Sequence, residues 1–364
     1  MTMSYPKTYV PVLRTKRGEF FAIRDLSEVA RSRIMPFFDC HRQTPLEIDK
    51  GITFDRHIKK ILALIDKYWP IERPFYFDIL SISPDTRMEN DRHPLSFCGE
   101  HFGKTKARSI FTIGPDRTQN FLSAMKDALA STHATEICVR IPKDEIGTPD
   151  VTVATVLDQL KSLELTREQA HLVLDMRYIV EAEVDELIDH VSNFAASAEI
   201  KSWKSFIVAA TAFPIDMRDI QSDEVTRLKR VELKLWKALV KAEPLIGRKP
   251  TYADYGIINP EKPEVDVRVM RGSCKIRYTT DSEWIVVKGH SERKTLGRVQ
   301  YPVLTSKLVK ETGYLGKEYS WGDNYIHECA STGSPTGNGE TWVRVDTNHH
   351  LTLVGETISS LSLT

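Results

Sequence analysis

The sequence has no excess of charge of either sign, because its 364 residues contain 50 Lys and Arg against 50 Asp and Glu. Proteins that bind duplex nucleic acid or anionic membranes nonspecifically usually present a net positive surface. We therefore do not expect nonspecific binding of duplex nucleic acid. A local basic groove that takes a small nucleotide remains compatible with this composition.

Long apolar runs and paired cysteines are also missing. No apolar run approaches the roughly 20 residues needed to cross a bilayer, and the first 13 residues lack the sections of a signal peptide. The cysteines are odd in number and form no CxxC pair; they are Cys40, Cys98, Cys138, Cys274 and Cys329. This pattern favours a reducing compartment over a disulfide framework. We expect a soluble, cytoplasmic protein without a membrane span.

Short runs of β-branched and aromatic residues alternate with segments of helical periodicity along most of the chain. The eight runs cover residues 9–13, 34–40, 74–80, 109–113, 136–141, 171–176, 205–211 and 252–258. Such alternation over about 250 residues is typical of a (β/α)8 barrel. Their nearly continuous apolar character is what a parallel sheet covered by helices requires.

A doubly wound open sheet shows the same alternation and is the main alternative. Such a sheet usually carries a glycine-rich phosphate turn after its first strand, whereas residues 13–19 contain one glycine and neither a GxGxxG nor a Walker pattern. We predict an α/β fold with a TIM-like (β/α)8 barrel over residues 1–260. The seventh strand is expected to be followed by a helix over residues 224–242.

The alternation of strand-like and helix-like segments ends at Pro260. Residues 261–364 are predicted to form a C-terminal α+β appendage packed on the barrel. Residues 265–270, 274–279 and 283–288 read as antiparallel strands, with a turn at Asp281 and Ser282 between the last two. Helices are expected over 301–312, over 321–330 and from Thr341 onward.

The connection over residues 81–108 is long and rich in turn-forming residues, which is typical of a functional loop. We expect a lid on the C-terminal face of the barrel, with any crossover helix short. His93, Cys98 and His101 lie there, but their spacing matches no standard zinc signature, so surface loop positions are the favoured interpretation. Cys40 and His41 do not read as a nucleophile–base pair, because neighbouring strand residues point to opposite faces.

Four carboxylates fall late in predicted strands, namely Asp39, Asp78, Asp175 and Asp254. Late strand positions face one mouth of a barrel, so these groups could converge on a divalent ion such as Mg²⁺ or Mn²⁺, or act as acid and base. The alternative is structural pairing with basic side chains or helix capping. Arg42, Arg140 and Arg177 are suitable partners, and their guanidinium groups also suit a phosphate or nucleotide.

The appendage is rich in aromatic, amide, carboxylate and imidazole groups. Asn348, His349 and His350 could cap helices, ligate or transfer protons, and Asp323 would share a helix face with His327. The alternative is that Trp321 and Trp342 pack on the barrel while the polar groups satisfy helix ends. Arg277, Tyr278 and Trp284 could stack on a base, although cross-strand packing explains them equally well.

Five stretches of the chain resemble the Beta protein family of phages and bacteria. They read YVPVL at residues 9–13, TYADYGIINP at 251–260, IRYTT at 276–280, SWGD at 320–323 and TNHHL at 347–351. The resemblance implies a role in phage–host conflict but no defined activity. Positions carried over as the family's signature are Asp254, Tyr255, Gly256, Arg277, Tyr278, Trp321, Gly322, Asp323, Asn348, His349 and His350, and a shared site is expected at the junction of barrel and appendage.

Two functions follow as hypotheses, beside a third in which the protein is structural or moonlighting and its vestigial barrel mouth is empty and closed by salt bridges. The first is a component of anti-phage defence that senses or binds a protein partner, either a companion protein or a phage protein, with a barrel mouth compatible with a nucleotide or phosphate. The alternative is a metal-dependent phosphodiesterase or nuclease. Candidate catalytic residues are Asp39, Asp78, Asp175, Asp254 and His349; candidate ligand-binding residues are Arg42, Arg140, Arg177, Tyr255, Arg277, Tyr278, Trp321, Asp323, Asn348 and His350.

Overall fold

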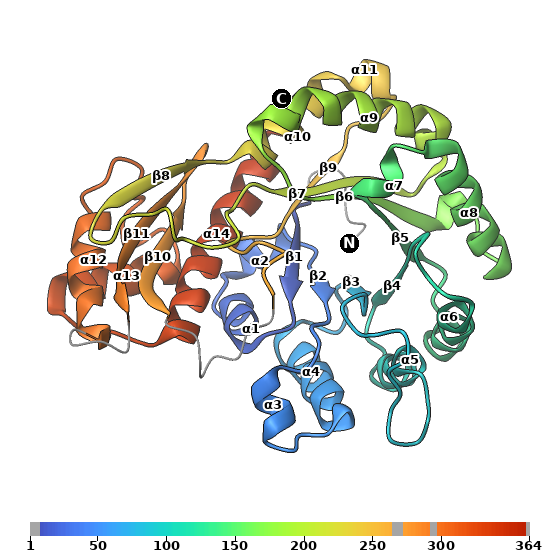
Figure 1. The fold of residues 1–364 in the computed structure, drawn as a ribbon, viewed down its shortest axis with the longest axis horizontal. Coiled ribbons are helices and arrows are strands. Elements are labelled where there is room, and N and C mark those ends of the chain that lie inside the picture. Colours follow the sequence, from blue (N-terminus) through green and yellow to red (C-terminus); the bar gives the residue numbers. More distant parts are fainter. Residues whose placement is uncertain (1–7, 264–271, 292–296, 362–364) are drawn as a thin grey trace.

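The structure is a computed structural model that describes residues 8–263, 272–291 and 297–361. Eight parallel strands close into a barrel in the order β1-β2-β3-β4-β5-β6-β7-β9 (Figure 1). They are β1 (Val10–Arg14), β2 (Phe37–Asp39), β3 (Phe75–Asp78), β4 (Ser109–Ile113), β5 (Ile137–Pro142), β6 (Ala170–Tyr178), β7 (Ser205–Thr211) and β9 (Thr251–Asp254). All eight strands lie within or beside the predicted runs, which confirms the TIM-like barrel.

Helices surround the barrel and cover the outer face of its sheet (Figure 1). They are α1 (Arg17–Arg24), α2 (Glu28–Ser32), α3 (Pro45–Asp49), α4 (Phe54–Tyr68), α5 (Pro94–Thr105), α6 (Gln119–Thr132), α7 (Lys143–Ile146), α8 (Pro149–Ser162), α9 (Val184–Ser197), α10 (Val231–Lys241) and α11 (Glu243–Ile246), with single turns of 3₁₀ helix at η1 (Arg167–Gln169), η2 (Glu181–Glu183) and η3 (Ile200–Ser202). Helix α4 shows why these segments form. Thr53 caps its N-terminus by accepting a hydrogen bond from the Arg56 N–H, and Ile58, Ile61 and Ile65 bury one stripe.

Strand residues alternate between the barrel interior and the helix layer. Inward positions such as Phe37, Tyr76, Cys138 and Val173 form one buried cluster inside the barrel. Outward positions such as Phe38 belong to a larger cluster shared with the helices. This alternation follows from the pleat of the strands and decides which late strand residues can meet at the mouth.

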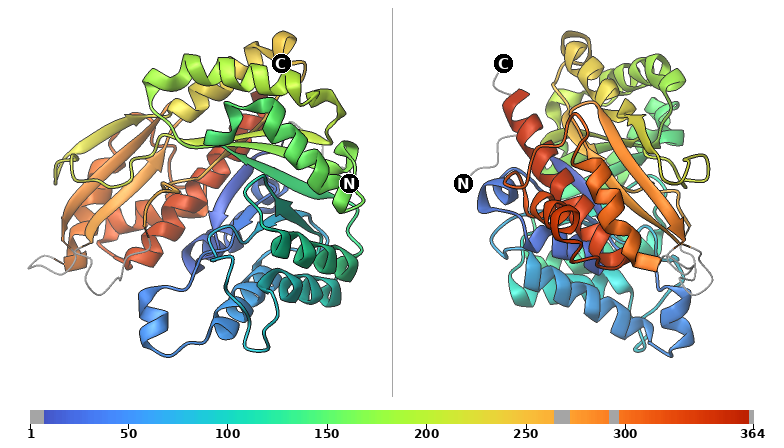
Figure 2. Two further views of the ribbon diagram at one scale, coloured as in Figure 1. Left: turned by 45° about the vertical axis from the view of Figure 1, so that its right-hand side comes forward. Right: turned by 90° about the vertical axis from the view of Figure 1, so that its left-hand side faces the viewer.

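The appendage is a three-stranded antiparallel sheet covered by helices, and it lies against one side of the barrel (Figures 1 and 2). Its strands are β8 (Val225–Lys229), β10 (Ser273–Thr279) and β11 (Glu283–Ser291); its helical elements are η4 (Gly297–Gln300), α12 (Tyr301–Leu308), α13 (Trp321–Thr332) and α14 (Gly339–Leu361). Helix α14 lies between the small sheet and the barrel, where it packs on β10, α1 and α2. The predicted strand at residues 265–270 lies outside the described residues.

The helix predicted over residues 224–242 is wrong in its first part, because Val225–Lys229 forms strand β8. This strand pairs antiparallel with β11, with Leu228 opposite Trp284 and Thr226 opposite Val286. The helical period begins only at Val231, in α10. Pairing with a strand about 55 residues later in the chain overrides the local helical pattern, as tertiary contacts often do. The appendage sheet therefore includes a strand from the segment between β7 and β9.

The connection after β3 also contains a longer helix than predicted. Helix α5 has 12 residues, with His93 as its N-cap and Pro94 as its first residue. After this helix only residues 106–108 precede β4, and the longer irregular part of the connection covers residues 79–93. Leu80 and Ser81 from this part line the mouth of the barrel. Among the described residues, no helix has both the length and the apolar character that crossing a membrane requires.

Close packing of α5 on α6 gives a first prediction. A Cβ atom added at Gly99 would lie 2.4 Å from the Cα of Ala128, which is backbone and cannot turn away. We expect Gly99→Ala to destabilise the protein by about 1–3 kcal/mol, because overpacking outweighs the gain of about 1 kcal/mol in helix propensity. The measurement is urea unfolding. Gly147→Ala is the matched control, since nothing lies within 4 Å of its Cβ position; equal effects of the two changes would contradict the packing.

Candidate functional site

Five inward side chains meet at the C-terminal mouth of the barrel. They are Asp39 (β2), Asp78 (β3), Arg140 (β5), Asp175 (β6) and Tyr255, which directly follows β9. Each lies two positions after an inward residue of its own strand, so the pleat brings them to the same end of the barrel. All except Asp39 are buried, and Asp39 is partly exposed. Four of the five were predicted from the sequence to meet here.

Arg140 occupies the centre of this group. Its Nε donates to Asp175 Oδ2 at 2.9 Å, and its Nη1 lies 3.0 Å from Asp78 Oδ2 and 3.4 Å from Asp39 Oδ2. Its Nη2 donates to the Tyr255 hydroxyl oxygen at 3.0 Å, and the Tyr255 O–H in turn donates to Asp175 at 2.6 Å. The guanidinium thus lies where a metal ion shared by the three carboxylates would have to bind.

The electrostatics of the mouth follow from this pairing. Burial alone would lower the pKa of Arg140, but Asp175, Tyr255, Asp39 and Asp78 together raise it well above its usual value. Burial raises the pKa of Asp39, with Arg140 acting in the opposite direction. Among the described residues, no hydrogen bond reaches the buried Oδ1 of Asp39. Arg117 adds a second cation, with its Nη2 3.0 Å from Asp78 Oδ1.

Asp254 does not join the mouth, which corrects the prediction that the four late carboxylates converge. Its neighbours Ala253 and Tyr255 face the barrel interior, so the pleat directs Asp254 to the outer side. There it accepts hydrogen bonds from the hydroxyl groups of Tyr9 and Tyr252 and from His350 on α14. The carboxylate therefore joins β1 and β9 to the appendage.

Most of the other predicted residues of the appendage are buried around α14, where His350 and Asn348 contact the barrel and the rest pair within the appendage. His350 Nδ1 lies 2.8 Å from Thr279 Oγ1, and His349 contacts Asp323 Oδ2 and the Thr279 carbonyl, each at 2.8 Å. Four further hydrogen bonds complete this set. The Tyr278 O–H donates to Asp323 Oδ1 and Arg277 Nε donates to Asp346 Oδ2, each at 2.7 Å. Asn348 accepts from the Gly322 N–H at 2.9 Å and donates to the Ala22 carbonyl oxygen at 3.0 Å.

These contacts leave little room for a ligand at Tyr278, His349 and His350. The rings of Tyr278 and His349 stack with their centroids 3.8 Å apart. Each ring covers one face of the other, and a nucleotide base cannot stack on a covered face. Burial lowers the pKa of His350, so its ring is neutral and serves as a hydrogen-bonding group. Trp321 is partly exposed, and its indole lies beneath the Arg344 guanidinium at 3.7 Å. The expected junction of barrel and appendage is thus a buried polar contact.

Several other candidates are separated. Arg42 is exposed and lies outside both the mouth and the junction. Arg177, by contrast, lines the mouth at its rim, 4.0 Å from Glu261, where its backbone has a positive φ of 53°. His93, Cys98 and His101 do not form a metal-ligand group, since Cys98 is fully buried while His101 pairs with Asp66 at 2.7 Å. Burial also raises the pKa of the Cys40 thiol well above its usual value, which removes it as a nucleophile.

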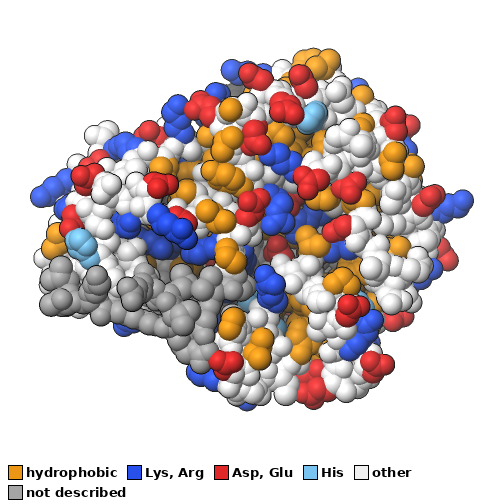
Figure 3. Space-filling view, viewed as in Figure 1, with side chains coloured by type: hydrophobic (Ala, Val, Ile, Leu, Met, Phe, Trp, Pro, Cys, Tyr) orange, Lys and Arg blue, Asp and Glu red, His pale blue; other side chains and the backbone are white. Residues whose placement is uncertain are grey.

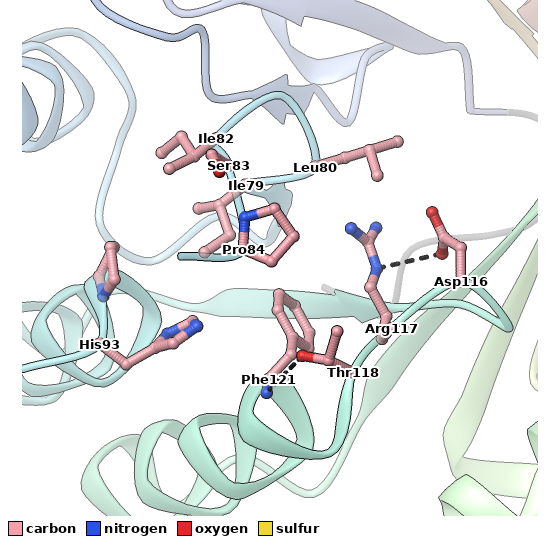
Figure 4. A pocket seen from close by; sticks show the side chains of 11 residues that line it. Ile79, Leu80, Ile82, Ser83, Pro84, His93, Asp116, Arg117, Thr118 and Phe121 are labelled. Carbon is pink, nitrogen blue, oxygen red and sulfur yellow. Dashed lines mark hydrogen bonds and ion pairs between the residues drawn. The ribbon is translucent and has the colours of Figure 1, made fainter. Parts of the chain in front are cut away.

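Two of the cavities near the mouth are small. One, of about 130 Å³, lies between the loop after β3 and the start of α6, with Leu80 and Pro84 on one side and Arg117 and Phe121 on the other (Figure 4). The other, of about 200 Å³, is the mouth itself. Ligand pockets for molecules of nucleotide size usually have about 300–1,000 Å³, so neither is large enough alone.

A cleft of about 610 Å³ lies beside the mouth, between the barrel and the appendage. We call it the junction cleft; Arg14 lines both it and the mouth. Its apolar wall includes Ile61, Leu64, Ile258 and Trp342. Its basic side chains are Arg14, Lys16, Arg17, Lys60, Lys262, Lys275 and Arg277, against Glu19, Glu47 and Glu340. Lys and Arg side chains also gather over the middle of the face that includes the mouth (Figure 3).

Lys262 is the most informative of these cations. It is partly buried, and burial together with Arg277, Lys16 and Arg14 lowers its pKa. In the part of the chain that the structure describes, no ion pair joins Lys262 to a carboxylate. Burial raises the pKa of Glu19 to about 7, against the effect of Lys16 and Arg14, so this neighbouring carboxyl is only partly ionised at neutral pH. Among the described residues, the lining of the junction cleft thus has more basic side chains than carboxylates.

One wall of the junction cleft also carries a group that could hold a metal ion. His41, Glu47 and His57 each place a ligand atom within 4.8 Å of the other two. Burial and the neighbouring His57 lower the pKa of His41 to about 3, so its ring is neutral. Burial would raise the pKa of Glu47, but the backbone N–H of Thr44 and nearby cations lower it to about 2, so the carboxylate is ionised.

Sequence reasoning missed Arg14, Arg117, Lys262 and this group of three. Arg14 ends β1 and could have been found from its register beside Asp39. Lys262 follows a turn and Glu47 lies in the short helix α3, and no periodic pattern in the sequence predicts where these two segments are placed. His41 and His57 are 16 residues apart, in a loop and a helix, so only the folded chain brings them together.

The central position of Arg140 gives a second prediction. Arg140→Met leaves buried carboxylates without their shared cation, and removing one member of such a pair usually costs about 3–5 kcal/mol. We expect a loss of that size in the free energy of unfolding, measured with urea at neutral pH. Arg177→Met is the matched control, because Arg177 is more than a third exposed and should contribute less than about 1 kcal/mol. A loss at Arg140 no larger than at Arg177 would contradict a structural role.

Comparisons with known proteins give one match that spans the chain. No curated protein matches the sequence. The family model described as Beta protein matches residues 9–356, which include every strand of the barrel and nearly all of the appendage. The resemblance carried by the five sequence stretches is thereby confirmed, and the chain belongs to the Beta protein family.

Proposed function

We propose that the protein binds a phosphate-bearing small molecule, of the nucleotide class, in the junction cleft. The observation that carries this proposal is Lys262, a partly buried ammonium whose pKa is lowered by burial and by Arg277, Lys16 and Arg14. Like charges brought together at such a site oppose one another until an anion enters. A phosphate accepts several charge-assisted hydrogen bonds at once and suits a cleft lined by both Arg and Lys.

The size and the lining residues of the junction cleft favour a nucleotide over free phosphate as its ligand. The cleft measures about 610 Å³, within the usual range for ligands of that size. Ile61, Leu64 and Ile258 supply an apolar surface on which a base can pack, and the cations line the same cleft. Arg14 continues the basic lining toward the mouth, so the mouth adjoins this site rather than forming it.

The alternative proposal, a metal-dependent phosphodiesterase or nuclease, has less support at the mouth. Mg²⁺ or Mn²⁺ held by Asp39, Asp78 and Asp175 would have to displace Arg140 from its contacts with all three. Such a displacement would leave a buried guanidinium without partners, which is costly. Binding without hydrolysis at the mouth is therefore the proposal we favour.

The match to the Beta protein family names no activity, so the biological setting of this binding is part of the proposal. We propose that the protein acts in the cytoplasm as a sensor or partner-binding component in phage–host conflict, and that a nucleotide in the cleft changes its affinity for a companion or phage protein. The cleft lies between barrel and appendage, so a ligand that touches both can shift their contacts. Equal numbers of acidic and basic residues argue against nonspecific duplex binding.

The test is calorimetric titration with ATP, ADP, AMP and inorganic phosphate. We expect at least one nucleotide to bind, and Lys262→Gln to weaken that binding about 10- to 100-fold, as loss of one charge-assisted contact predicts. Lys126→Gln, at an exposed position on α6, is the matched control and should bind as the wild type does. Failure of the whole panel to bind at millimolar concentration, or equal affinities of the two variants, would overturn the proposal.

A further inference from the structure

The group formed by His41, Glu47 and His57 lies apart from both the mouth and the buried junction. His41 follows β2, Glu47 belongs to α3 and His57 to α4. All three line the junction cleft. The rings of His41 and His57 meet edge to face, with centroids 5.0 Å apart.

The hydrogen bonds of His57 fix which of its nitrogens faces the group. Its Nε2 lies 2.8 Å from the backbone carbonyl oxygen of His41. A carbonyl oxygen only accepts, so Nε2 must carry the proton. In the neutral ring, Nδ1 then presents a lone pair, and it faces the carboxylate oxygen Oε2 of Glu47 at 3.3 Å.

A lone pair that faces a carboxylate oxygen needs a positive charge between them. His57 is 1% exposed, and within the described residues its Nδ1 has no hydrogen-bond partner. This leaves two arrangements: the ring takes a second proton and pairs with Glu47, or a cation lies between Nδ1 and the carboxylate. The bond from Nε2 to a backbone carbonyl is the outer contact that metal-bound imidazoles usually make.

His41 is held in a comparable way. Its Nδ1 lies 2.8 Å from the hydroxyl oxygen of Thr15, which leaves Nε2 as the nitrogen for a ligand. The Thr15 hydroxyl oxygen also accepts a hydrogen bond from the His41 backbone N–H at 3.3 Å. Thr15 thus holds both the backbone and the ring of His41 in place.

We propose that His41, Glu47 and His57 bind one divalent transition-metal ion, with Zn²⁺ as the best-suited ion. Two imidazoles and one carboxylate suit Zn²⁺ better than Mg²⁺ or Ca²⁺, which prefer sets made of oxygen ligands. At bond lengths of about 2.1 Å, tetrahedral ligand atoms lie about 3.4 Å apart. The three ligand atoms, now within 4.8 Å of one another, therefore need only a small approach. A fourth position remains for water or a ligand of the cleft.

Two neighbouring groups act on this site in opposite directions. Lys60 Nζ lies 3.3 Å from Glu47 Oε1 and opposes a second cation, but its side chain is half exposed and can turn into solvent. Thr44 favours the site, because its N–H donates to Glu47 Oε2 at 3.1 Å and holds the carboxylate in place. Metal binding does not require the nucleotide, so it can fail or succeed independently of the proposed function.

The experiment titrates chelator-stripped protein with Zn²⁺ by calorimetry and with Co²⁺ by visible absorption, in the absence of any nucleotide. We expect one equivalent to bind, with a Co²⁺ spectrum of low coordination number. His57→Gln and His41→Gln should weaken binding at least 100-fold. Glu47→Gln should also weaken it, and this variant keeps the acceptor for the Thr44 N–H, so its fold is the least disturbed.

His101→Gln is the matched control, because His101 also pairs with a carboxylate, Asp66 at 2.7 Å, but lies outside the cleft. It should bind Zn²⁺ as the wild type does. Circular dichroism and thermal unfolding establish that each variant is folded. The proposal is overturned if the stripped wild type binds no Zn²⁺, if folded Glu47→Gln and His57→Gln bind as tightly as wild type, or if His101→Gln weakens binding equally.

Discussion

The alternation of side chains along the barrel strands decides how this protein is arranged. Residues two apart on a strand face the same side of the sheet, so Asp39, Asp78, Arg140 and Asp175 point into the barrel just beyond its apolar layer. The same rule directs Asp254 outward, toward His350 on α14. One geometric constraint thus produces a closed, salt-bridged mouth on the inside and a polar joint to the appendage on the outside.

The two consequences are linked energetically. Buried charges are tolerated only when they are paired, and here each carboxylate has a partner within the fold. Arg140 forms ion pairs with Asp39, Asp78 and Asp175. Asp254 accepts hydrogen bonds from His350 and from two tyrosine hydroxyl groups. The proposed ligand site lies elsewhere, in the junction cleft, where Lys262 lies near Arg14, Lys16 and Arg277.

Much of the fold was predictable because its signals are local and periodic. The eight apolar runs predicted the eight strands. The alternation of side chains along β9 also predicts the direction of Asp254: Ala253 and Tyr255 face the barrel interior, so Asp254 between them faces outward. Strand β8 was not predictable in this way, because its residues become a strand only through pairing with β11. The cleft was missed for a similar reason: Lys262, His41 and His57 come from turns, loops and a helix that only the closed barrel and the docked appendage bring together.

The central claim is that ligands bind in the junction cleft while Arg140 keeps the mouth closed to metal ions. A crystal structure of the protein soaked with the best-binding nucleotide and Mg²⁺ tests this most directly. The account predicts phosphate density beside Lys262 and Arg14, with the contacts from Arg140 to Asp78 and Asp175 intact. Phosphate or Mg²⁺ bound between Asp39, Asp78 and Asp175, with Arg140 displaced, would contradict it.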